Sequence, residues 1–317
     1  MRYDVAWIGP LVCDVMTKPV DVIPESGKLE RVNSIELFTG GCSMNVCVDL
    51  CKIGIKTTIV GKVGNDAFGD FLKNSLAACG AGIDGIQTDA RLQTSASVVL
   101  SASGGERSFL HCVGVNASFS DADVDWDVIE KSDIVFVGGT MLMDAFDGEP
   151  CARVYKRAQE MGKITVLDTA WDSQNRWMSV LGPCLKYVDY FLPSVEEARA
   201  ASGKEDMDAI ADFFFDYGVR HVVIKNGKHG AYMRYSRDSE PLNLPTYNSA
   251  PVVDTTGAGD SFCAGFLAGL ARGMSFEDCG RLANAVGTFC VGAKGASTGI
   301  RSLDEIQRYM QEHKPGE

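Results

Sequence analysis

The sequence predicts a three-layer α/β/α fold with a mostly parallel central sheet and a small β lid beside it. Short apolar runs rich in β-branched residues alternate with amphipathic stretches along nearly the whole chain of 317 residues. Such alternation is typical of a parallel sheet that is covered by helices on both faces. Two segments interrupt the alternation and indicate the lid. No period of about 20–50 residues repeats, so a solenoid is not expected.

The elements of the main domain follow one another in a regular order. The strand-like runs occupy residues 3–8, 57–62, 133–137, 163–167, 187–192 and 221–225. The helix-like stretches occupy residues 43–53, 67–79, 150–161, 194–202, 207–217 and 258–270. Gly54 and Gly80 stand where the first two helices should end, a position that commonly adopts the left-handed conformation. These elements predict one α/β domain, which consists of residues 1–11, 39–93 and 114–317.

The lid is predicted from residues 12–38 and 94–113. The first segment contains valines, isoleucines and two prolines but has no helical period. The second predicts a hairpin with its turn at Gly104 and Gly105. Strands of this kind can bury only one face, so we expect a small β structure that stands beside the main sheet. Two ordinary surface excursions are the alternative.

The charge balance excludes several classes of function. The chain has 30 Lys and Arg against 42 Asp and Glu, which gives a formal net charge of −12. An acidic chain is not attracted to phosphate backbones or anionic lipid, so we expect neither nucleic-acid nor membrane partners. No apolar run reaches the ~18 residues of a membrane span, and the first residues do not resemble a secretory signal. We therefore expect a cytoplasmic protein that acts on a small molecule.

The eleven cysteines do not indicate disulfides or a metal site. Thiols stay reduced in the cytoplasm, and no C-x-x-C motif occurs. Cys42, Cys47 and Cys51 fall at helical spacing, which favours small buried side chains over metal ligands. With only four histidines, neither a zinc site of paired histidines nor a His-centred catalytic relay is expected.

The most informative segment is residues 252–266, with the sequence VVDTTGAGDSFCAGF. A β-type run is followed by small residues and by a helix that should begin near Ala258. Small residues at a helix N-terminus let backbone amides approach an anion, which the helix dipole also favours. Asp260 lies inside this first turn, where its carboxylate would repel phosphate unless it accepts a proton from an attacking hydroxyl. The alternative is that Asp260 only caps the helix or complements its dipole.

A second glycine pair, Gly40 and Gly41, opens the first long helix. Asn45 lies one turn into that helix and could meet a hydroxyl group with both a donor and an acceptor. Asp14 follows the first strand, near the carboxyl edge at which open α/β sheets bind ligands. Neither a G-x-G-x-x-G after the first strand nor a P-loop motif is present, which disfavours a nicotinamide-binding fold and a P-loop kinase.

These motifs resemble those of the ribokinase-like (PfkB) carbohydrate kinases. The resemblance rests on TGGCSMN at residues 39–45, VGKVGNDAFG at residues 60–69 and the acidic glycine motif at residues 254–266. The signature regions occur in the family's order, and the order of strands and helices agrees along about residues 3–312. The resemblance implies a ribokinase-like fold and ATP-dependent phosphorylation of a hydroxyl on a small sugar or polyol.

The resemblance also implies a role for each matching residue. Asp260 matches the catalytic base, and the backbone of the preceding turn matches the anion hole. The anion-hole residues are Gly257, Ala258 and Gly259. The implied sugar-binding residues are Asp14, Gly40, Gly41 and Asn45. The implied nucleotide-binding residues are Ser194, Lys225, Gly227, Gly230 and Asn284.

Two further implications of the resemblance are less direct, and one more candidate comes from the lid hairpin itself. Asp254 and Thr256 stand where the family often binds a monovalent cation such as K⁺. The lid of such kinases often pairs with a second lid, which implies a homodimer. Arg107, on the lid hairpin, could reach a ligand, although a solvated charge on an edge strand is the favoured alternative.

One motif departs from the family pattern. The family's N-x-x-E, which helps to hold magnesium and phosphate through water, is Ser194-Val195-Glu196-Glu197 in this chain. Glu197 keeps the acid and is expected to act on Mg²⁺ through water, whereas Ser194 could equally be only the N-cap of its helix. Asp168, at the end of a strand, could contact nucleotide or metal-bound water, or could simply form a turn.

Other functions remain open. A nucleoside kinase of the same superfamily would share every motif, and a sugar-binding regulator that has lost catalysis would lack an intact Asp260. A nicotinamide dehydrogenase would need the missing glycine fingerprint. The sequence does not identify the sugar, because the lid and pocket residues that select it lie outside these motifs.

Overall fold

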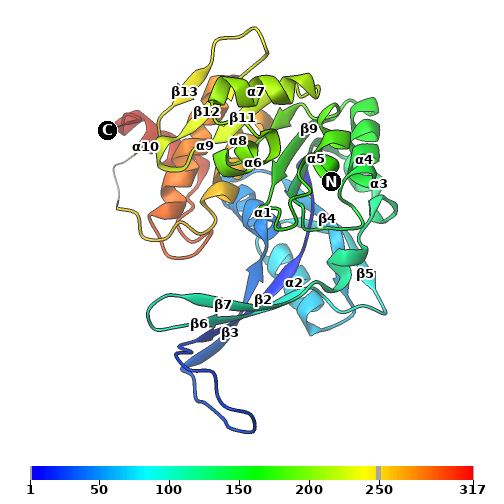
Figure 1. Ribbon diagram of the computed structural model, residues 1–317, viewed down its shortest axis with the longest axis vertical. Coiled ribbons are helices and arrows are strands. Elements are labelled where there is room, and N and C mark those ends of the chain that lie inside the picture. Colours follow the sequence, from blue (N-terminus) through cyan, green and yellow to red (C-terminus); the bar gives the residue numbers. More distant parts are fainter. Residues whose placement is uncertain (1, 248–250, 317) are drawn as a thin grey trace.

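The computed structural model describes residues 2–247 and 251–316 and confirms the three-layer α/β/α architecture (Figure 1). The main-sheet strands are β1 (Tyr3–Ile8), β4 (Thr57–Gly64), β5 (Gly82–Asp89), β8 (Ser132–Thr140), β9 (Ile164–Thr169), β10 (Tyr190–Phe191), β11 (His221–Lys225), β12 (Ala231–Arg234) and β13 (Leu242–Leu244). The α-helices are α1 (Cys42–Ile53), α2 (Ala67–Ala78), α3 (Trp126–Glu130), α4 (Glu149–Glu160), α5 (Met178–Leu185), α6 (Val195–Ser202), α7 (Met207–Asp216), α8 (Ala258–Ala271), α9 (Phe276–Val291) and α10 (Leu303–Glu312). The 3-10 helices are η1 (Gly114–Ser118), η2 (Asp121–Asp123) and η3 (Gly227–His229).

The main sheet has nine strands in the order β13-β12-β11-β10-β9-β8-β1-β4-β5. The pairs between β5 and β11 in this order are parallel, whereas β11–β12 and β12–β13 are antiparallel. Parallel strands end at the same edge of a sheet. Residues that follow β1, β9 and β11 therefore gather at one edge, where open α/β sheets bind ligands.

The sheet is buried on both faces, as β1 shows. Val5 and Trp7 pack into one apolar cluster, which also holds residues of α1, α2, α8, α9 and α10. Ala6 and Ile8 pack into a second cluster, with residues of α3, α4, α5, α6 and α7. Burial on both faces explains why the central strands are continuous apolar runs in the sequence.

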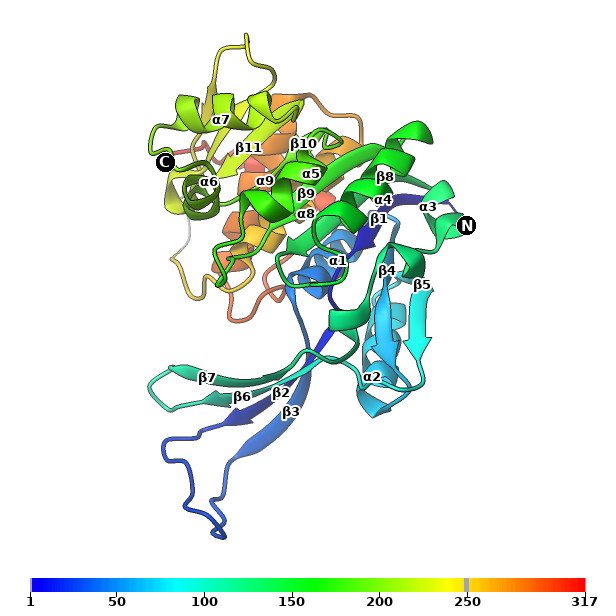
Figure 2. The same cartoon turned by 45° about the vertical axis from the view of Figure 1, so that its right-hand side comes forward.

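A second sheet of four strands contains the segments predicted as the lid. It consists of β2 (Val12–Lys18), β3 (Ser34–Gly40), β6 (Ala96–Ser101) and β7 (Arg107–Cys112), in the order β3-β2-β6-β7. In both views this sheet extends away from the α/β body (Figures 1 and 2). The two segments, which are far apart in the sequence, are thus parts of one β structure.

Directly paired residues share a face of this second sheet, and its register forms one polar row and one apolar row on opposite faces. One face carries a row of paired polar side chains, which we call the polar row. The polar row consists of Asp14, Ser97 and His111. The other face carries an apolar row one residue along each strand. The apolar row consists of Leu37, Val15, Val98 and Leu110.

One strand is shorter than the sequence predicts. The sequence predicts a strand over residues 187–192, but β10 comprises only Tyr190–Phe191. The reason is that Tyr187 and Val188 close the end of α5, since their backbone amides donate to carbonyls in its last turn. Within residues 2–247 and 251–316, none of the helices combines the length and the apolar character needed to cross a membrane.

Candidate active site

Several predicted site residues gather where β9 and β11 end and where α1, α6 and α8 begin. The residues at this place are Asn45 of α1, Asp168 of β9, Glu197 of α6, Lys225 of β11 and Asp260 of α8. They come from five elements that are widely spaced in the chain. The parallel sheet brings them together because β9 and β11 end at the same edge.

Asp260 lies in the first turn of α8, and its side chain is held by Asn45. The side-chain amide nitrogen of Asn45 donates to a carboxylate oxygen of Asp260 at 2.8 Å. Burial raises the pKa of Asp260 to about 7, and the negative charge of Asp168 adds to this. The hydrogen bond from Asn45 and the charge of Lys225 act in the opposite direction. A carboxyl group with this pKa can take up and release a proton near neutral pH, as a general base must.

The two glycines before Asp260 differ in their surroundings. Gly257 is the N-cap of α8 with φ 78°, and a Cβ there would lie 2.6 Å from the Cβ of Ala296. Both the backbone conformation and the packing therefore exclude a side chain at this position. Gly259 is exposed, and a Cβ there would meet only the ammonium nitrogen of Lys225, at 3.7 Å. Gly259 thus leaves the approach to Asp260 open.

Lys225 and Asp168 form an ion pair beside this turn. The ammonium nitrogen of Lys225 lies 2.6 Å from Asp168 Oδ1, and their side chains are only 11% and 5% exposed. Burial alone would lower the pKa of Lys225, but the charge of Asp168 holds that pKa well above its usual range. The same ammonium lies 3.7 Å from the sulfur of Cys263.

At the start of α6, Ser194 and Glu197 form a capping box. The Ser194 hydroxyl accepts from the Glu197 amide at 3.2 Å, and Glu197 Oε2 accepts from the Ser194 amide at 2.8 Å. Glu197 Oε2 also accepts from the Thr169 hydroxyl at 2.9 Å. The structure therefore shows Ser194 as the N-cap. Within the described residues these bonds leave Oε1 of Glu197 for a water molecule or a ligand.

The site suits a magnesium ion that is bound together with phosphate groups. Within residues 2–247 and 251–316, no cluster of three or more His, Cys, Asp or Glu side chains could hold a metal ion alone. Mg²⁺ prefers oxygen ligands, keeps several waters and is usually held by one or two carboxylates together with substrate phosphates. Glu197, with one carboxylate oxygen available, fits this pattern.

The segment before α8 holds the two oxygens predicted to bind a monovalent cation. The Asp254 carboxylate accepts from the backbone amides of Thr256 and Gly295, each at 3.0 Å, and these bonds lower its pKa. The Thr256 carbonyl accepts from the Cys290 thiol at 3.4 Å. The charge of Arg107, the first residue of β7, also lowers the pKa of Asp254.

Asp14 lies at the base of the lid within the polar row. Burial raises its pKa, whereas a hydrogen bond from Ser97 and the charge of His111 oppose this rise. The Ser97 hydroxyl lies 3.0 Å from Nδ1 of His111. A Cβ on Gly40 would overlap the carboxylate of Asp14, so Gly40 makes room for that side chain. Gly41, the N-cap of α1, has φ 88° and so adopts a conformation that favours glycine.

The residues predicted on the nucleotide side have different surroundings. Gly227 is exposed, with open space around its Cα. Gly230 has φ 86°, and a Cβ there would overlap the backbone after β13. The side-chain amide of Asn284 is buried and donates to the carbonyls of Leu244 at 3.0 Å and Pro245 at 3.3 Å. Ala258 belongs instead to the turn predicted as the anion hole. Its backbone amide donates to the Thr255 carbonyl at 3.2 Å, so this amide is already paired within the turn.

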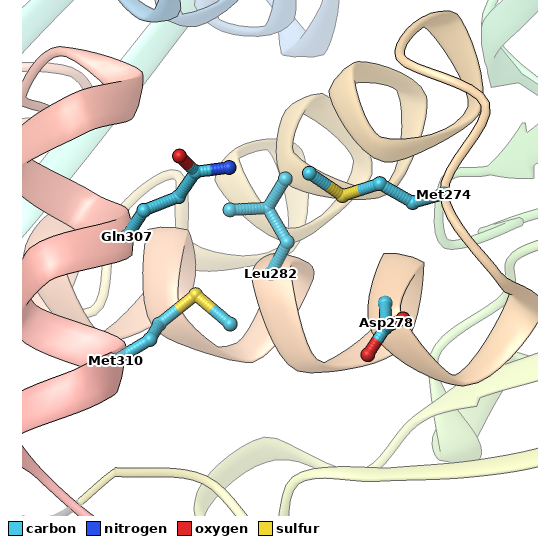
Figure 3. A pocket seen from close by; sticks show the side chains of 5 residues that line it. All are labelled: Met274, Asp278, Leu282, Gln307 and Met310. Carbon is cyan, nitrogen blue, oxygen red and sulfur yellow. The ribbon is translucent and has the colours of Figure 1, made fainter.

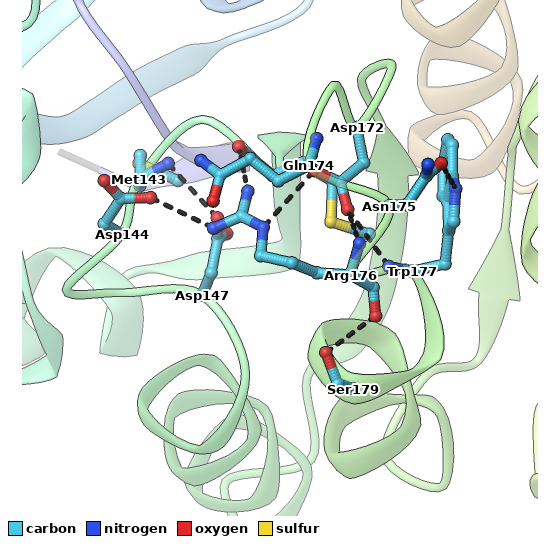
Figure 4. A network of polar contacts seen from close by, with 10 residues as sticks. Met143, Asp144, Asp147, Asp172, Gln174, Asn175, Arg176, Trp177 and Ser179 are labelled. Carbon is cyan, nitrogen blue, oxygen red and sulfur yellow. Dashed lines mark hydrogen bonds and ion pairs between the residues drawn. The ribbon is translucent and has the colours of Figure 1, made fainter.

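A polar network fixes the chain that follows Asp168 (Figure 4). The guanidinium of Arg176 donates to Asp172 at 3.3 Å, to Asp144 at 3.1 Å and to the Met141 carbonyl at 2.7 Å. Asp144 and Met141 belong to the loop after β8, and Arg176 belongs to the loop after β9. The network therefore ties together two loops at the carboxyl edge of the sheet.

A separate cavity of about 190 Å³ lies between α9 and α10 (Figure 3). Its lining residues are Met274, Asp278, Leu282, Gln307 and Met310. None of the predicted site residues lines it. The cavity is therefore not part of the site built around Asp260.

Sequence reasoning did not find three of these contacts. It assigned Asn45 to the substrate but not to Asp260, and it did not pair Lys225 with Asp168. It also left out Ser97, although this serine lies among apolar residues in β6, where a polar side chain is a usable signal. Each of these contacts depends on how distant strands and helices pack, which no local motif records.

Comparisons with known proteins point to one family. A family model described as "pfkB family carbohydrate kinase" matches residues 4–303. An uncharacterized sugar kinase of Archaeoglobus fulgidus is 30% identical over 80% of this chain and 99% of its own. The aminoimidazole riboside kinase of Salmonella typhimurium is 26% identical over 93% of each chain.

The fold is also found among solved structures. The Arabidopsis thaliana ribokinase, solved with ribose and ATP, superposes with a TM-score of 0.84 at 24% identity. The match covers 97% of this chain and 98% of the ribokinase chain. At this level of identity the match concerns the fold, which includes both the main sheet and the lid.

Proposed function

Because this chain belongs to the pfkB family of carbohydrate kinases, and is therefore a kinase, we propose that it phosphorylates a hydroxyl of a small sugar or polyol with ATP as the donor. The observation that carries the proposal is the Asn45–Asp260 pair at the open N-terminus of α8. A carboxyl group with a pKa of about 7 lies there beside the backbone of a helix start. Such a helix start favours a transferring phosphoryl group.

The proposed reaction is an in-line transfer. Asp260 takes the proton from the substrate hydroxyl while the hydroxyl oxygen forms a bond to the γ-phosphorus. The bond between that phosphorus and the β–γ bridging oxygen breaks, and ADP leaves. The backbone of Gly257, Ala258 and Gly259 lies beside the charge that develops on the phosphoryl oxygens. Asn45 holds the carboxylate of Asp260 in place for the proton transfer.

The substrate is proposed to lie between the lid and α1. Asp14 and Asn45 would bind its hydroxyl groups, and Gly40 and Gly41 let the backbone come close to it. Arg107, whose charge lowers the pKa of Asp254, would close over the site. The lid segments, residues 12–38 and 94–113, would then exclude water that could otherwise hydrolyse ATP. Substrate should therefore slow amide hydrogen exchange in both segments together, and exchange unchanged by substrate would contradict closure.

The nucleotide is proposed to lie along the loop from Lys225 to Gly230, with Ser194 and Asn284 nearby. Gly227 is the exposed residue of this loop that could approach phosphate or adenosine. Magnesium bound to the nucleotide supplies positive charge against the phosphates, and Glu197 would hold it through water. The ribokinase of Arabidopsis thaliana was solved with ATP, which supports the choice of donor.

A monovalent cation is proposed at Asp254 and the Thr256 carbonyl. Both oxygens are fixed by hydrogen bonds and lie just before α8. A cation there would stabilise the turn that carries Gly257. Turnover should then be higher in potassium than in sodium or tetramethylammonium buffer at equal ionic strength. Equal turnover in the three buffers would contradict this assignment.

A homodimer through the lid is also proposed. The apolar row is exposed to solvent on one side of a four-stranded sheet, with Leu110 67% and Leu37 42% exposed. An exposed row of large apolar side chains of this kind often marks a surface that a partner covers. A second copy of the same chain would offer an equal row, so a twofold pairing buries both.

A nucleoside kinase is the second candidate, because one of the relatives is named as a riboside kinase. The two functions are separated by a substrate panel. Purified protein with ATP and magnesium is assayed for ADP release against pentoses, hexoses, keto-acid sugars, polyols and nucleosides. A sugar or polyol as the best substrate supports the proposal, a nucleoside favours the second candidate, and no acceptor above the background rate of ATP hydrolysis contradicts both.

A further inference from the structure

The Lys225–Asp168 ion pair is placed where the phosphoryl group would pass. The Lys225 ammonium lies 3.7 Å from the position that a Cβ on Gly259 would occupy. Gly259 belongs to the first turn of α8, directly before Asp260. A positive charge near an open helix N-terminus adds to the attraction that the turn offers to an anion. The ammonium of Lys225 thus lies beside the first turn of α8, where the phosphoryl group is proposed to pass.

The hydrogen bonds of the ammonium leave it able to bind a further acceptor. An ammonium has three N–H donors. One is directed at Asp168 Oδ1, at 2.6 Å, and another at the Cys263 sulfur, at 3.7 Å. Sulfur is a weak acceptor. Within the described residues, at least one strong donor of Lys225 is therefore left for a ligand.

The charges around Lys225 also favour binding of a phosphate group by its ammonium. The negative charges of Asp168 and Glu197 both raise its pKa, and its own charge lowers the pKa of Asp260. This part of the site holds more carboxylates than cations. A phosphate group that enters it needs a counter-charge, and Lys225 supplies one that is already desolvated and fixed.

Asp168 explains how a flexible lysine can be fixed in this way. A lysine side chain carries its ammonium on a flexible stem of four carbons, and the ammonium is normally hydrated. The side chain of Asp168 is 5% exposed. Asp168 lies near the end of the central strand β9, and the Arg176 network secures the loop after that strand. Asp168 is therefore a rigid anchor that keeps the ammonium beside Gly259.

We propose that the Lys225 ammonium, held in position by Asp168, binds the γ-phosphate of the nucleotide during transfer. This inference rests on the proposed function and assigns distinct roles to the two residues. Lys225 touches the transferring group, and Asp168 is a positioning residue that acts through Lys225. If the ion pair between β9 and β11 were purely structural, a different result would be expected. Replacing both partners of a buried pair by uncharged residues of similar volume often leaves folding stability unchanged.

The test compares the binding of Mg-ATP and Mg-ADP by titration calorimetry. The variants are Lys225→Met, Asp168→Asn and the double variant, with Lys204→Met, an exposed lysine outside the proposed nucleotide loop, as the control. The double variant is included because Lys225→Met alone leaves Asp168 buried and unpaired, which can destabilise the fold. Circular dichroism and melting temperature verify that each variant is folded.

We expect Lys225→Met and the double variant to weaken ATP binding at least about tenfold more than ADP binding, since a hydrogen bond to a charged group is lost only with ATP. Asp168→Asn should give a smaller loss in the same direction, and adding it to Lys225→Met should cause no further loss. The control should change both affinities equally. Equal loss of ATP and ADP binding in a folded double variant, or no loss, would overturn the inference. Absence of nucleotide binding by the wild-type protein would instead overturn the proposed function, and this inference with it.

Discussion

The side-chain amide of Asn45 lies 2.8 Å from the carboxylate of Asp260, although the two residues are 215 positions apart in the chain. The contact joins the start of α1 to the start of α8. It also gives Asn45 a defined influence on chemistry, because its hydrogen bond lowers the pKa of Asp260.

The first prediction concerns the pH dependence of the reaction. A general base must be ionised, so kcat/KM should fall as the pH decreases through about 7, the pKa of Asp260. Asn45→Ala removes a hydrogen bond that stabilises the ionised form, so the fall should begin at a higher pH in this variant. Asn33→Ala, a change in the exposed lid loop, is the control and should leave the profile in place. A fall at the same pH in Asn45→Ala and wild type would contradict the proposed coupling.

The second prediction concerns the stability of the Asp260→Asn variant. The folded state raises the pKa of Asp260 from 3.8 to about 7, so it binds the proton more tightly than the unfolded chain does. The stabilising contribution of this group is therefore complete below about pH 3.8 and is lost as the pH rises through about 7. Asparagine does not titrate.

At about pH 8 the variant should therefore melt at a higher temperature than the wild-type protein, and the difference should shrink toward about pH 5. Differential scanning calorimetry across this range measures it. If the difference in melting temperature does not change with pH, burial does not raise the pKa of Asp260.

The third prediction separates the two glycines of the turn. Gly259→Val adds a side chain at an exposed position beside Lys225, so turnover should fall at least about tenfold while the melting temperature changes by less than about 2 °C. Gly257→Ala forces a side chain into a left-handed residue that packs against Ala296. It should lower the melting temperature clearly, because both strain and overlap result. Thermal melts and turnover are measured on the same preparations. Equal loss of stability in both variants would contradict the different roles of Gly257 and Gly259.

The fourth prediction concerns the lid dimer. The wild-type protein should be a dimer at micromolar concentration by light scattering. Leu110→Glu places a charge in the apolar row and should give monomers. Leu29→Glu changes a residue that is 82% exposed but lies outside the row, and it should remain dimeric. A wild-type monomer would remove the dimer and leave the kinase proposal standing.

The main sheet could be predicted from the sequence because its strands are buried on both faces. Strands that helices cover on both faces appear in the sequence as short continuous apolar runs, as β1 and β11 do. Strand β5 was not predicted, since GIDGIQTD contains two glycines and two aspartates, which are rare in strands. It forms nevertheless because it pairs with β4 along almost its full length.

The site could be predicted only where its residues lie within a local motif. The turn from Gly257 to Asp260 is such a motif, since the chemistry and the helix start coincide. The Lys225–Asp168 pair is different, because it forms only when β9 and β11 lie on either side of β10 in the sheet. Strand order of this kind follows from tertiary packing and leaves no trace in residue spacing.

The central claim is that Asp260 is the base of a phosphoryl transfer, and the turnover of Asp260→Asn tests it most directly. The variant is compared with the wild-type protein on the best substrate of the panel, at saturating Mg-ATP and about pH 8, with substrate affinity measured separately. General-base catalysis contributes about 10²–10⁴ in rate, so kcat should fall at least ~100-fold while the substrate dissociation constant changes little. A folded variant that keeps more than about a tenth of the wild-type turnover would contradict the account.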